Sequence, residues 1–74
     1  AIVFRVPGDA RKVRVSCAGA SAEGAVEAFV AGPGPVDCTV AVVLADRSRR
    51  TAKVEGATRG AYSCFGGATD ACTR

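Results

Sequence analysis

The chain has 74 residues, in which ten lysines and arginines against seven aspartates and glutamates give a formal net charge of +3. This length allows a single domain over residues 1–74 with a small hydrophobic core, and 49% hydrophobic residues argue against disorder. So small a charge predicts no nucleic-acid partner, and no apolar run approaches the roughly 20 residues of a membrane helix.

The N-terminal part of the chain predicts two short strands. Residues 2–6, Ile-Val-Phe-Arg-Val, are strand-like, and Pro-Gly-Asp at 7–9 supplies a turn after them. In residues 11–17 apolar and polar side chains alternate strictly, which is the pattern of a strand with one buried and one solvated face.

Residues 21–30 are compatible with two structures. We expect a strand over residues 24–30, which places Glu27 and Phe29 on one of its faces. The alternative is a helix that begins at Ser21, but Gly24 and the Gly-Pro-Gly-Pro break at 32–35 leave that helix barely two turns long.

The C-terminal half predicts a hairpin followed by a further strand. Residues 38–45 are apolar on both faces and are expected to form the central, most buried strand. A polar turn at 46–50 leads into an alternating segment at 51–55, so residues 38–55 read as a hairpin. A turn at 56–60 precedes a strand at 61–65, and Gly66-Gly67 begins a loop-like tail that carries Cys72.

Four cysteines and no histidine indicate a disulfide framework made in an oxidising compartment, and hence a secreted protein. No close cysteine pair is present, so we expect no zinc site and no other metal. We favour Cys17–Cys38 as a bridge across the core and Cys64–Cys72 as a bridge that closes the tail. The pairing Cys17–Cys64 with Cys38–Cys72 stays open.

These elements predict an all-β fold, a small antiparallel β-sandwich or barrel of five to six short strands cross-linked by two disulfides. The core is expected to consist mainly of Val, Ala, Ile and Leu, because only four residues are aromatic. Such a core supplies little stability, and a disulfide that closes a loop of about twenty residues adds roughly 3 kcal/mol.

The residue types argue against an enzyme. Without histidine the usual general base near neutral pH is missing, and so short a chain leaves little room for a cleft between two catalytic carboxylates. We therefore expect no catalytic residues and no cofactor.

A binding surface is the remaining function, and the best candidate is the basic loop that contains Arg47, Ser48, Arg49 and Arg50. A rigid loop binds with little ordering cost, and an inhibitor of a serine protease would offer Arg47 or Arg49 to an acidic pocket. The same arginines would also suit a solvated turn. A second candidate is the proline-stiffened loop at 32–37.

In size, cysteine count and strand content the chain resembles the small secreted two-disulfide β-proteins of actinomycetes, among them α-amylase and protease inhibitors. The bias toward Ala, Gly, Val and Arg is also typical of a GC-rich bacterium. The Trp-Arg-Tyr triplet of such amylase inhibitors is absent, so the resemblance implies no binding residues here.

We favour an extracellular hydrolase as the protein partner. The alternative is an accessory or glycan-binding, cell-wall-binding sandwich module of a larger extracellular protein. For a glycan, Tyr62 and Phe65 are the only clustered aromatics, and their place on opposite faces of one strand makes a poor stacking platform. Open strand edges suggest a monomer or a weak homodimer.

Overall fold

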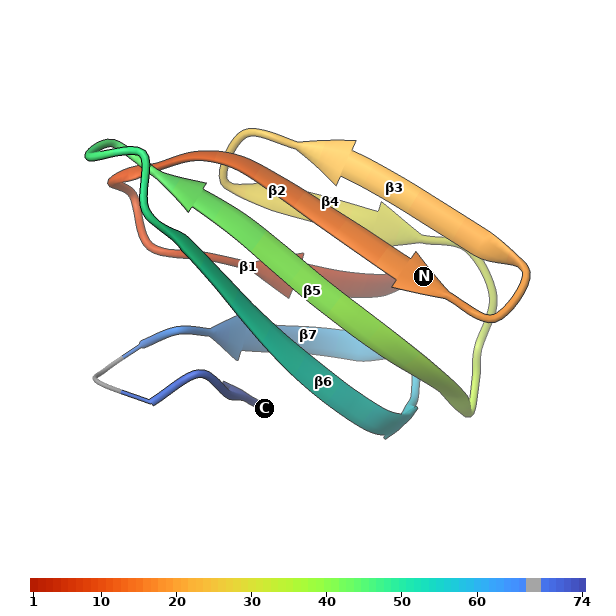
Figure 1. The fold of residues 1–74 in the computed structure, drawn as a ribbon. Coiled ribbons are helices and arrows are strands. Elements are labelled where there is room, and N and C mark those ends of the chain that lie inside the picture. Colours follow the sequence, from red (N-terminus) through yellow and green to blue (C-terminus); the bar gives the residue numbers. More distant parts are fainter. Residues whose placement is uncertain (67–68) are drawn as a thin grey trace.

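The computed structural model describes residues 1–66 and 69–74, and these form strands and turns without any helix. Eight strands follow one another along the chain (Figure 1): β1 (Ile2–Arg5), β2 (Ala10–Cys17), β3 (Ala20–Gly24), β4 (Glu27–Val30), β5 (Val36–Leu44), β6 (Arg49–Ala57), β7 (Gly60–Cys64) and β8 (Cys72–Thr73). The all-β class is confirmed, but the count of five to six strands is too low. Residues 21–30 contribute to two strands, β3 and β4, in place of one.

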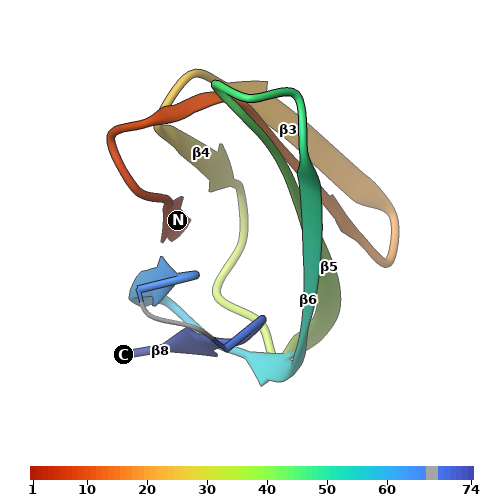
Figure 2. The same ribbon diagram turned by 60° about the vertical axis from the view of Figure 1, so that its left-hand side comes forward.

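The strands form two four-stranded sheets that face each other as a sandwich, and Figure 2 shows the two layers. Sheet A has the order β4-β1-β7-β8, and sheet B has the order β3-β2-β5-β6. The chain crosses from one layer to the other several times, so each sheet combines segments that are far apart in the sequence.

Sheet B is built from antiparallel neighbours. Its β2–β3 hairpin closes through Ala18 and Gly19, and glycine readily adopts the positive φ of 77° at the second of these positions. The β5–β6 hairpin corresponds to the one expected over residues 38–55. β2 and β5 pair with each other in the middle of the sheet, where Val15 lies opposite Val40.

Sheet A differs from the expected antiparallel arrangement in one pair of strands. β1 pairs with β4 in antiparallel register, with Val3 opposite Phe29, but it pairs with β7 in parallel register, with Phe4 opposite Tyr62. Two parallel strands need a long crossover connection, and here residues 6–59, which include all of sheet B, lie between β1 and β7. Hairpin signals in the sequence do not reveal such a pairing.

The core lies between the inward faces of the two sheets. The Phe4 and Tyr62 rings stack at 5.5 Å between centroids in sheet A. Among the described residues no polar or charged side chain is buried. The largest fully buried side chains include the expected valines and isoleucine together with two phenylalanines: Phe4, Phe65, Ile2, Val13, Val15, Val40 and Val42.

Strand β5 is central in sheet B, but it is buried on one face only. Val40 and Val42 face the core, whereas Thr39, Ala41 and Val43 on the other face are half-buried. The expectation of burial on both faces is therefore wrong, because one sheet covers the inner face and no third layer covers the outer one. These small side chains form part of the protein surface.

Both favoured disulfides are present, Cys17–Cys38 and Cys64–Cys72, with Cα–Cα distances of 4.1 and 3.9 Å. Each bridge joins direct register partners on adjacent strands, β2 with β5 and β7 with β8. The expectation that Cys17–Cys38 crosses the core is therefore wrong. The bridges cross-link strands within a sheet, and no disulfide joins the two sheets.

The tail expected to be loop-like contains the short strand β8. Cys72 pairs with Cys64, and Thr73 pairs with Ser63. After β8, the Arg74 guanidinium lies 4.9 Å from the centre of the Tyr62 ring. Gly67, at the expected start of the tail, lies outside the described residues.

Candidate functional site

The turn between β5 and β6 is closed by four hydrogen bonds. The N–H of Leu44 donates to the carbonyl oxygen of Ser48 at 2.9 Å, and the N–H of Arg47 donates to the carbonyl oxygen of Leu44 at 2.9 Å. The N–H and the hydroxyl of Ser48 donate to one carboxylate oxygen of Asp46, at 2.9 and 2.5 Å. We call residues 44–48 the basic turn.

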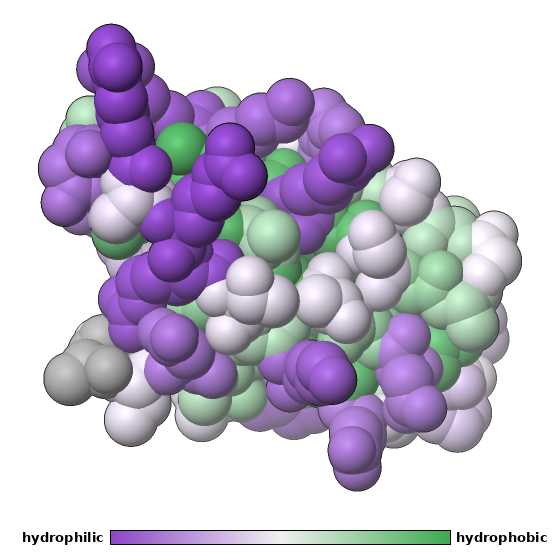
Figure 3. Space-filling model, in the orientation of Figure 1, coloured by the Kyte–Doolittle hydropathy of each residue, from purple (hydrophilic) through white to green (hydrophobic). Residues whose placement is uncertain are grey.

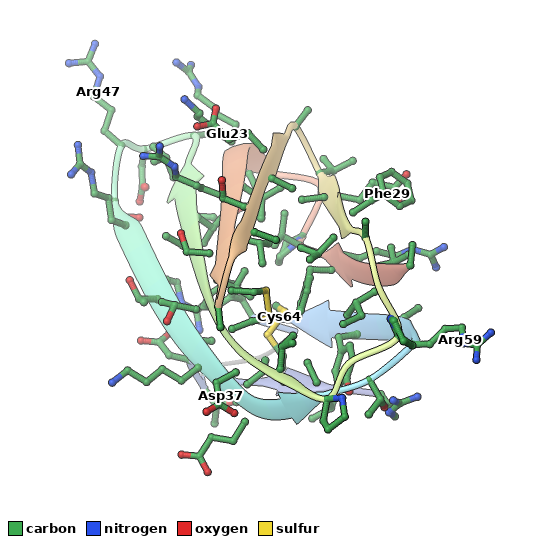
Figure 4. All side chains as sticks on the ribbon, turned by 90° about the vertical axis from the view of Figure 1, so that its right-hand side faces the viewer. Glu23, Phe29, Asp37, Arg47, Arg59 and Cys64 are labelled. Atoms are coloured by element: carbon green, nitrogen blue, oxygen red, sulfur yellow. A yellow bond between two sulfur atoms is a disulfide. The ribbon has the colours of Figure 1, made fainter. Side chains whose placement is uncertain are left out.

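Arg47 occupies the tip of the basic turn, and its side chain projects away from the sandwich (Figure 4). Its φ of 70° is left-handed and lets the chain reverse direction there. The N–H of Ala45 donates to the carbonyl oxygen of Asp9 at 3.0 Å and ties the turn to the β1–β2 connection. The turn thus presents an exposed guanidinium on a well-braced backbone.

Ser48 also stabilises the ionised form of Asp46. Its hydroxyl first, and its backbone N–H second, lower the pKa of Asp46 below the ordinary value of 3.8 by bonding the ionised carboxylate. Asp46 consequently remains an acceptor at any pH well above that value. Through its two hydrogen bonds to this carboxylate, Ser48 braces the backbone of the basic turn.

Arg49 and Arg50 point in different directions because successive side chains of a strand alternate. Arg49 is exposed on the outer face of sheet B. Arg50 is 22% exposed; its Nε donates to Asp70 at 2.6 Å, and its Nη2 donates to the carbonyl oxygen of Thr69 at 2.8 Å. Arg47 and Arg49 are thus both exposed, the first at the tip of the basic turn and the second on the outer face of sheet B, whereas Arg50 contacts the tail.

The outer face of sheet B carries a further group of cations. In one cross-strand row Lys12 and Arg49 flank Val43, and in the next row Arg14 and Thr51 flank Ala41. A third row places Ser16 and Lys53 on either side of Thr39. We call this surface the basic channel, with Lys12, Arg14, Arg49 and Lys53 at its sides and Thr39, Ala41 and Val43 as its floor.

The basic channel is a shallow hollow. A volume of about 410 Å³ opens over the rows of Lys12 and Arg14. Strands lie about 4.8 Å apart, so side chains on β2 and β6 stand about 10 Å from each other across β5. Figure 3 shows this face, with hydrophilic side chains gathered over the end with the basic turn and paler ones in the middle of the sheet.

Sequence reasoning identifies Arg49 as a binding residue but misses its partners in the channel. The alternation in residues 11–17 does place Lys12 and Arg14 on a solvated face. The sequence does not show, however, that β2 and β6 flank the same strand, and this pairing brings these cations together.

One acidic residue, Glu23 on β3, reaches the side of the channel. Its carboxylate lies 3.3 Å from Lys12 Nζ and 3.2 Å from Arg14 Nε. All three side chains are largely exposed, so these ion pairs contribute little stability. Glu23 therefore partly neutralises the β2 side of the channel.

The second predicted loop, at 32–37, makes structural contacts. The N–H of Arg59 donates to the carbonyl oxygen of Pro33 at 3.0 Å, and the Asp37 carboxylate accepts from the N–H of Gly56 at 2.9 Å. At Gly34, with a φ of 74°, a Cβ atom would lie 2.1 Å from the carbonyl oxygen of Ala57. The loop thus packs against the β6–β7 connection, and its contacts indicate a role in the fold.

The aromatic residues considered for glycan stacking, Tyr62 and Phe65, are both buried, at 7% and 2% exposure. Their expected placement on opposite faces is wrong, because Phe65 follows the end of β7 and its φ of 59° turns the ring into the core. The exposed aromatic is Phe29, at 57%, which lies beside Val3 on the outer face of sheet A.

Within residues 1–66 and 69–74, no three potential metal-ligating side chains come together in one group. The same residues contain no helix with the length and apolarity needed to cross a bilayer.

Neither the models of protein families, nor the curated proteins, nor the solved structures contain a match to this chain.

Proposed function

We propose that this chain is a small secreted binding protein, without catalytic activity, that docks the basic turn onto an acidic site of a protein partner. An extracellular hydrolase is the favoured partner. The observation that carries this proposal is the exposed guanidinium of Arg47 on a turn closed by four hydrogen bonds. Two disulfides are consistent with an extracellular or other oxidising environment.

The bracing of the turn favours binding because little conformational entropy remains to be lost. Ordering a loop or a long side chain on association costs free energy, and the backbone of the basic turn is already ordered before the partner arrives. Only the Arg47 side chain needs to become fixed. Arg49, two residues further on and exposed, can add a second charged contact.

The geometry of the turn also defines how the partner is engaged. A peptide that binds a protease as a substrate lies extended in the enzyme cleft, like an added strand. The φ of 70° at Arg47 reverses the chain at that residue. We therefore propose that Arg47 enters an acidic pocket as the tip of a closed turn, with no scissile bond presented to the enzyme.

The test is stoichiometric binding and inhibition. The disulfide-bonded protein is immobilised to capture secreted hydrolases from culture supernatant, and captured enzymes are titrated with the soluble protein. We expect inhibition near one equivalent, and a loss of affinity of at least ten-fold in Arg47→Ala. Arg59→Ala is the matched control, because Arg59 is an exposed arginine at the far end of the sandwich (Figure 4).

Two outcomes would contradict the proposal. The first is that Arg47→Ala and Arg59→Ala bind the captured enzyme equally well, which would exclude the basic turn from the interface. The second is capture of no protein at all, which would favour the accessory-module alternative. Sedimentation of the free protein then distinguishes a monomer from a weak homodimer.

A further inference from the structure

We infer that the basic channel binds an acidic linear polysaccharide, whose anionic groups contact the cations on both sides. This inference does not depend on docking by the basic turn, because Arg47 lies outside the channel. It rests on the position of the cations, on the small side chains of the floor and on the pairing of the central strand.

The positions of the cations suit a polymer with repeated charges. Lys12 and Arg49 face each other across Val43, and Arg14 and Lys53 follow in the next two rows. Rows on one face of a strand are about 6.7 Å apart, so the three rows cover about 13 Å along β5. A ligand with charges spaced along its length can contact both sides of the channel at once, which a single small anion cannot.

The floor suits a chain of sugar rings. Thr39, Ala41 and Val43 are small and half-buried, and they leave a level surface between the cations. Hydroxyl groups of Ser16, Thr39 and Thr51 lie in the same rows and can exchange hydrogen bonds with sugar hydroxyls. The guanidinium groups of Arg14 and Arg49 can each donate two parallel hydrogen bonds to a carboxylate.

The alternative polyanions fit this surface less well. An acidic peptide gains much of its affinity by adding a strand to a sheet edge. The edges of sheet B are β3 and β6, whereas the floor strand β5 is already paired with β2 and β6, so a peptide lying along the floor of the channel would gain no strand pairing. Single-stranded nucleic acid binds through aromatic side chains that stack on its bases, and no aromatic residue lies in the three rows of the channel.

The channel has defined limits. At the end away from the basic turn, Asp37 and Glu55 replace the cations, and Figure 4 shows Asp37 far from Arg47. Along the β2 side, Glu23 competes with the ligand for Lys12 and Arg14, at 3.3 and 3.2 Å. A bound polyanion must therefore occupy a short stretch and displace Glu23 from its two partners.

The test measures binding of a defined oligogalacturonate by calorimetry or biolayer interferometry at low and physiological salt. We expect affinity that falls with salt, because exposed charges are screened. Arg49→Gln and Lys53→Gln are each expected to weaken binding about five-fold, the limit for one exposed ion pair. Arg47→Ala is expected to bind normally, which separates this site from the proposed docking of a protein.

Matched controls distinguish the channel from general charge attraction. Arg59→Gln removes the same charge as Arg49→Gln but lies at the far end of the sandwich, and it is expected to change affinity less than two-fold. Glu23→Gln is expected to strengthen binding about two- to five-fold. Glu27→Gln is its control, because Glu27 pairs with Arg5 at 3.4 Å on the other sheet and is expected to have no effect.

The proposal is overturned if Arg59→Gln weakens binding as much as Arg49→Gln, or if Glu23→Gln gives no gain. It is also overturned if neutral dextran binds as tightly as the uronate, or if oligoglutamate of equal charge binds more tightly, which would assign the channel to a polypeptide. All these substitutions replace exposed or partly exposed side chains, so thermal unfolding of each variant is expected to match that of the unmodified protein.

Discussion

The guanidinium carbon of Arg50 lies 5.1 Å from the centre of the Phe65 ring. Arg50 belongs to β6 in sheet B, whereas Phe65 follows β7 in sheet A, so the contact joins the two layers. The same guanidinium reaches Asp70 and the carbonyl oxygen of Thr69 in the tail. An arginine that looks like part of a binding loop in the sequence thus joins three parts of the fold.

Replacing Arg50 should destabilise the protein. Arg50→Gln removes a charge-assisted bond to Asp70 and the stacking on Phe65, and we expect a loss of about 1–2 kcal/mol in the free energy of unfolding, since the guanidinium is partly exposed. Urea denaturation measures this loss. Arg49→Gln, one residue away and exposed, should cost less than about 0.5 kcal/mol. If Arg50→Gln lowers the free energy of unfolding as little as Arg49→Gln does, Arg50 has no structural role.

Removing either disulfide should cost a large part of the stability of so small a domain. The chain-entropy relation predicts about 3 kcal/mol for Cys17–Cys38, which spans 21 residues, and about 2.5 kcal/mol for Cys64–Cys72, which spans 8. The paired variants Cys17→Ala/Cys38→Ala and Cys64→Ala/Cys72→Ala are compared by denaturation. Peptide mapping without reductant checks the pairing, and a fragment that links Cys17 to Cys64 would contradict it.

Gly24 should tolerate no side chain. A Cβ atom at Gly24 would lie 1.9 Å from the carbonyl oxygen of Glu27, so Gly24→Ala forces the bend between β3 and β4 apart. We expect a cost of about 1–3 kcal/mol, typical of overpacking. Gly8→Ala is the control, because a Cβ atom there would meet no residue other than its chain neighbours within 4 Å, and it should be neutral or slightly stabilising in thermal unfolding. A neutral Gly24→Ala would mean that the bend adapts freely.

The basic turn should weaken in acid. The folded pKa of Asp46 is lowered, so its contribution to stability is complete above the unfolded value of about 3.8 and is lost as pH falls through the lower folded value. NMR titration of the Ser48 amide should report this loss only below about pH 4. In Ser48→Ala the pKa of Asp46 should return toward its ordinary value. An unchanged titration in this variant would show that Ser48 does not hold the carboxylate.

The sequence predicts well those parts of the fold that depend on local patterns. Alternation over residues 11–17 corresponds to β2, and the polar segment at 46–50 contains the turn of the hairpin, although Arg49 and Arg50 already belong to β6. The favoured cysteine pairing is confirmed, but the sequence leaves a second pairing open, because it does not show that β2 lies beside β5 and β7 beside β8. Strand β3 is not predicted, because its sequence, Ala-Ser-Ala-Glu-Gly, contains no β-branched or aromatic residue. It forms a strand because the hairpin turn places it beside β2.

The candidate site is only partly predictable for a related reason. Arg47 and Arg49 stand out as a local cluster, but alternation along β6 separates Arg49 from Arg50, and a left-handed residue sets the direction of Arg47. Lys12 and Lys53 lie 41 positions apart in the sequence. They flank one channel only because β2 and β6 pair with opposite sides of β5, which is a property of the whole sheet.

The parallel pairing of β1 with β7 has a consequence for the order in which the two sheets can form. Sheet B needs only residues 10–57. Ile2 and Phe4 gain their second neighbours, Gly60 and Tyr62, only through contacts that span 58 positions of the sequence. Contacts between residues so far apart form slowly, so β1 is expected to be among the last strands to reach its final place.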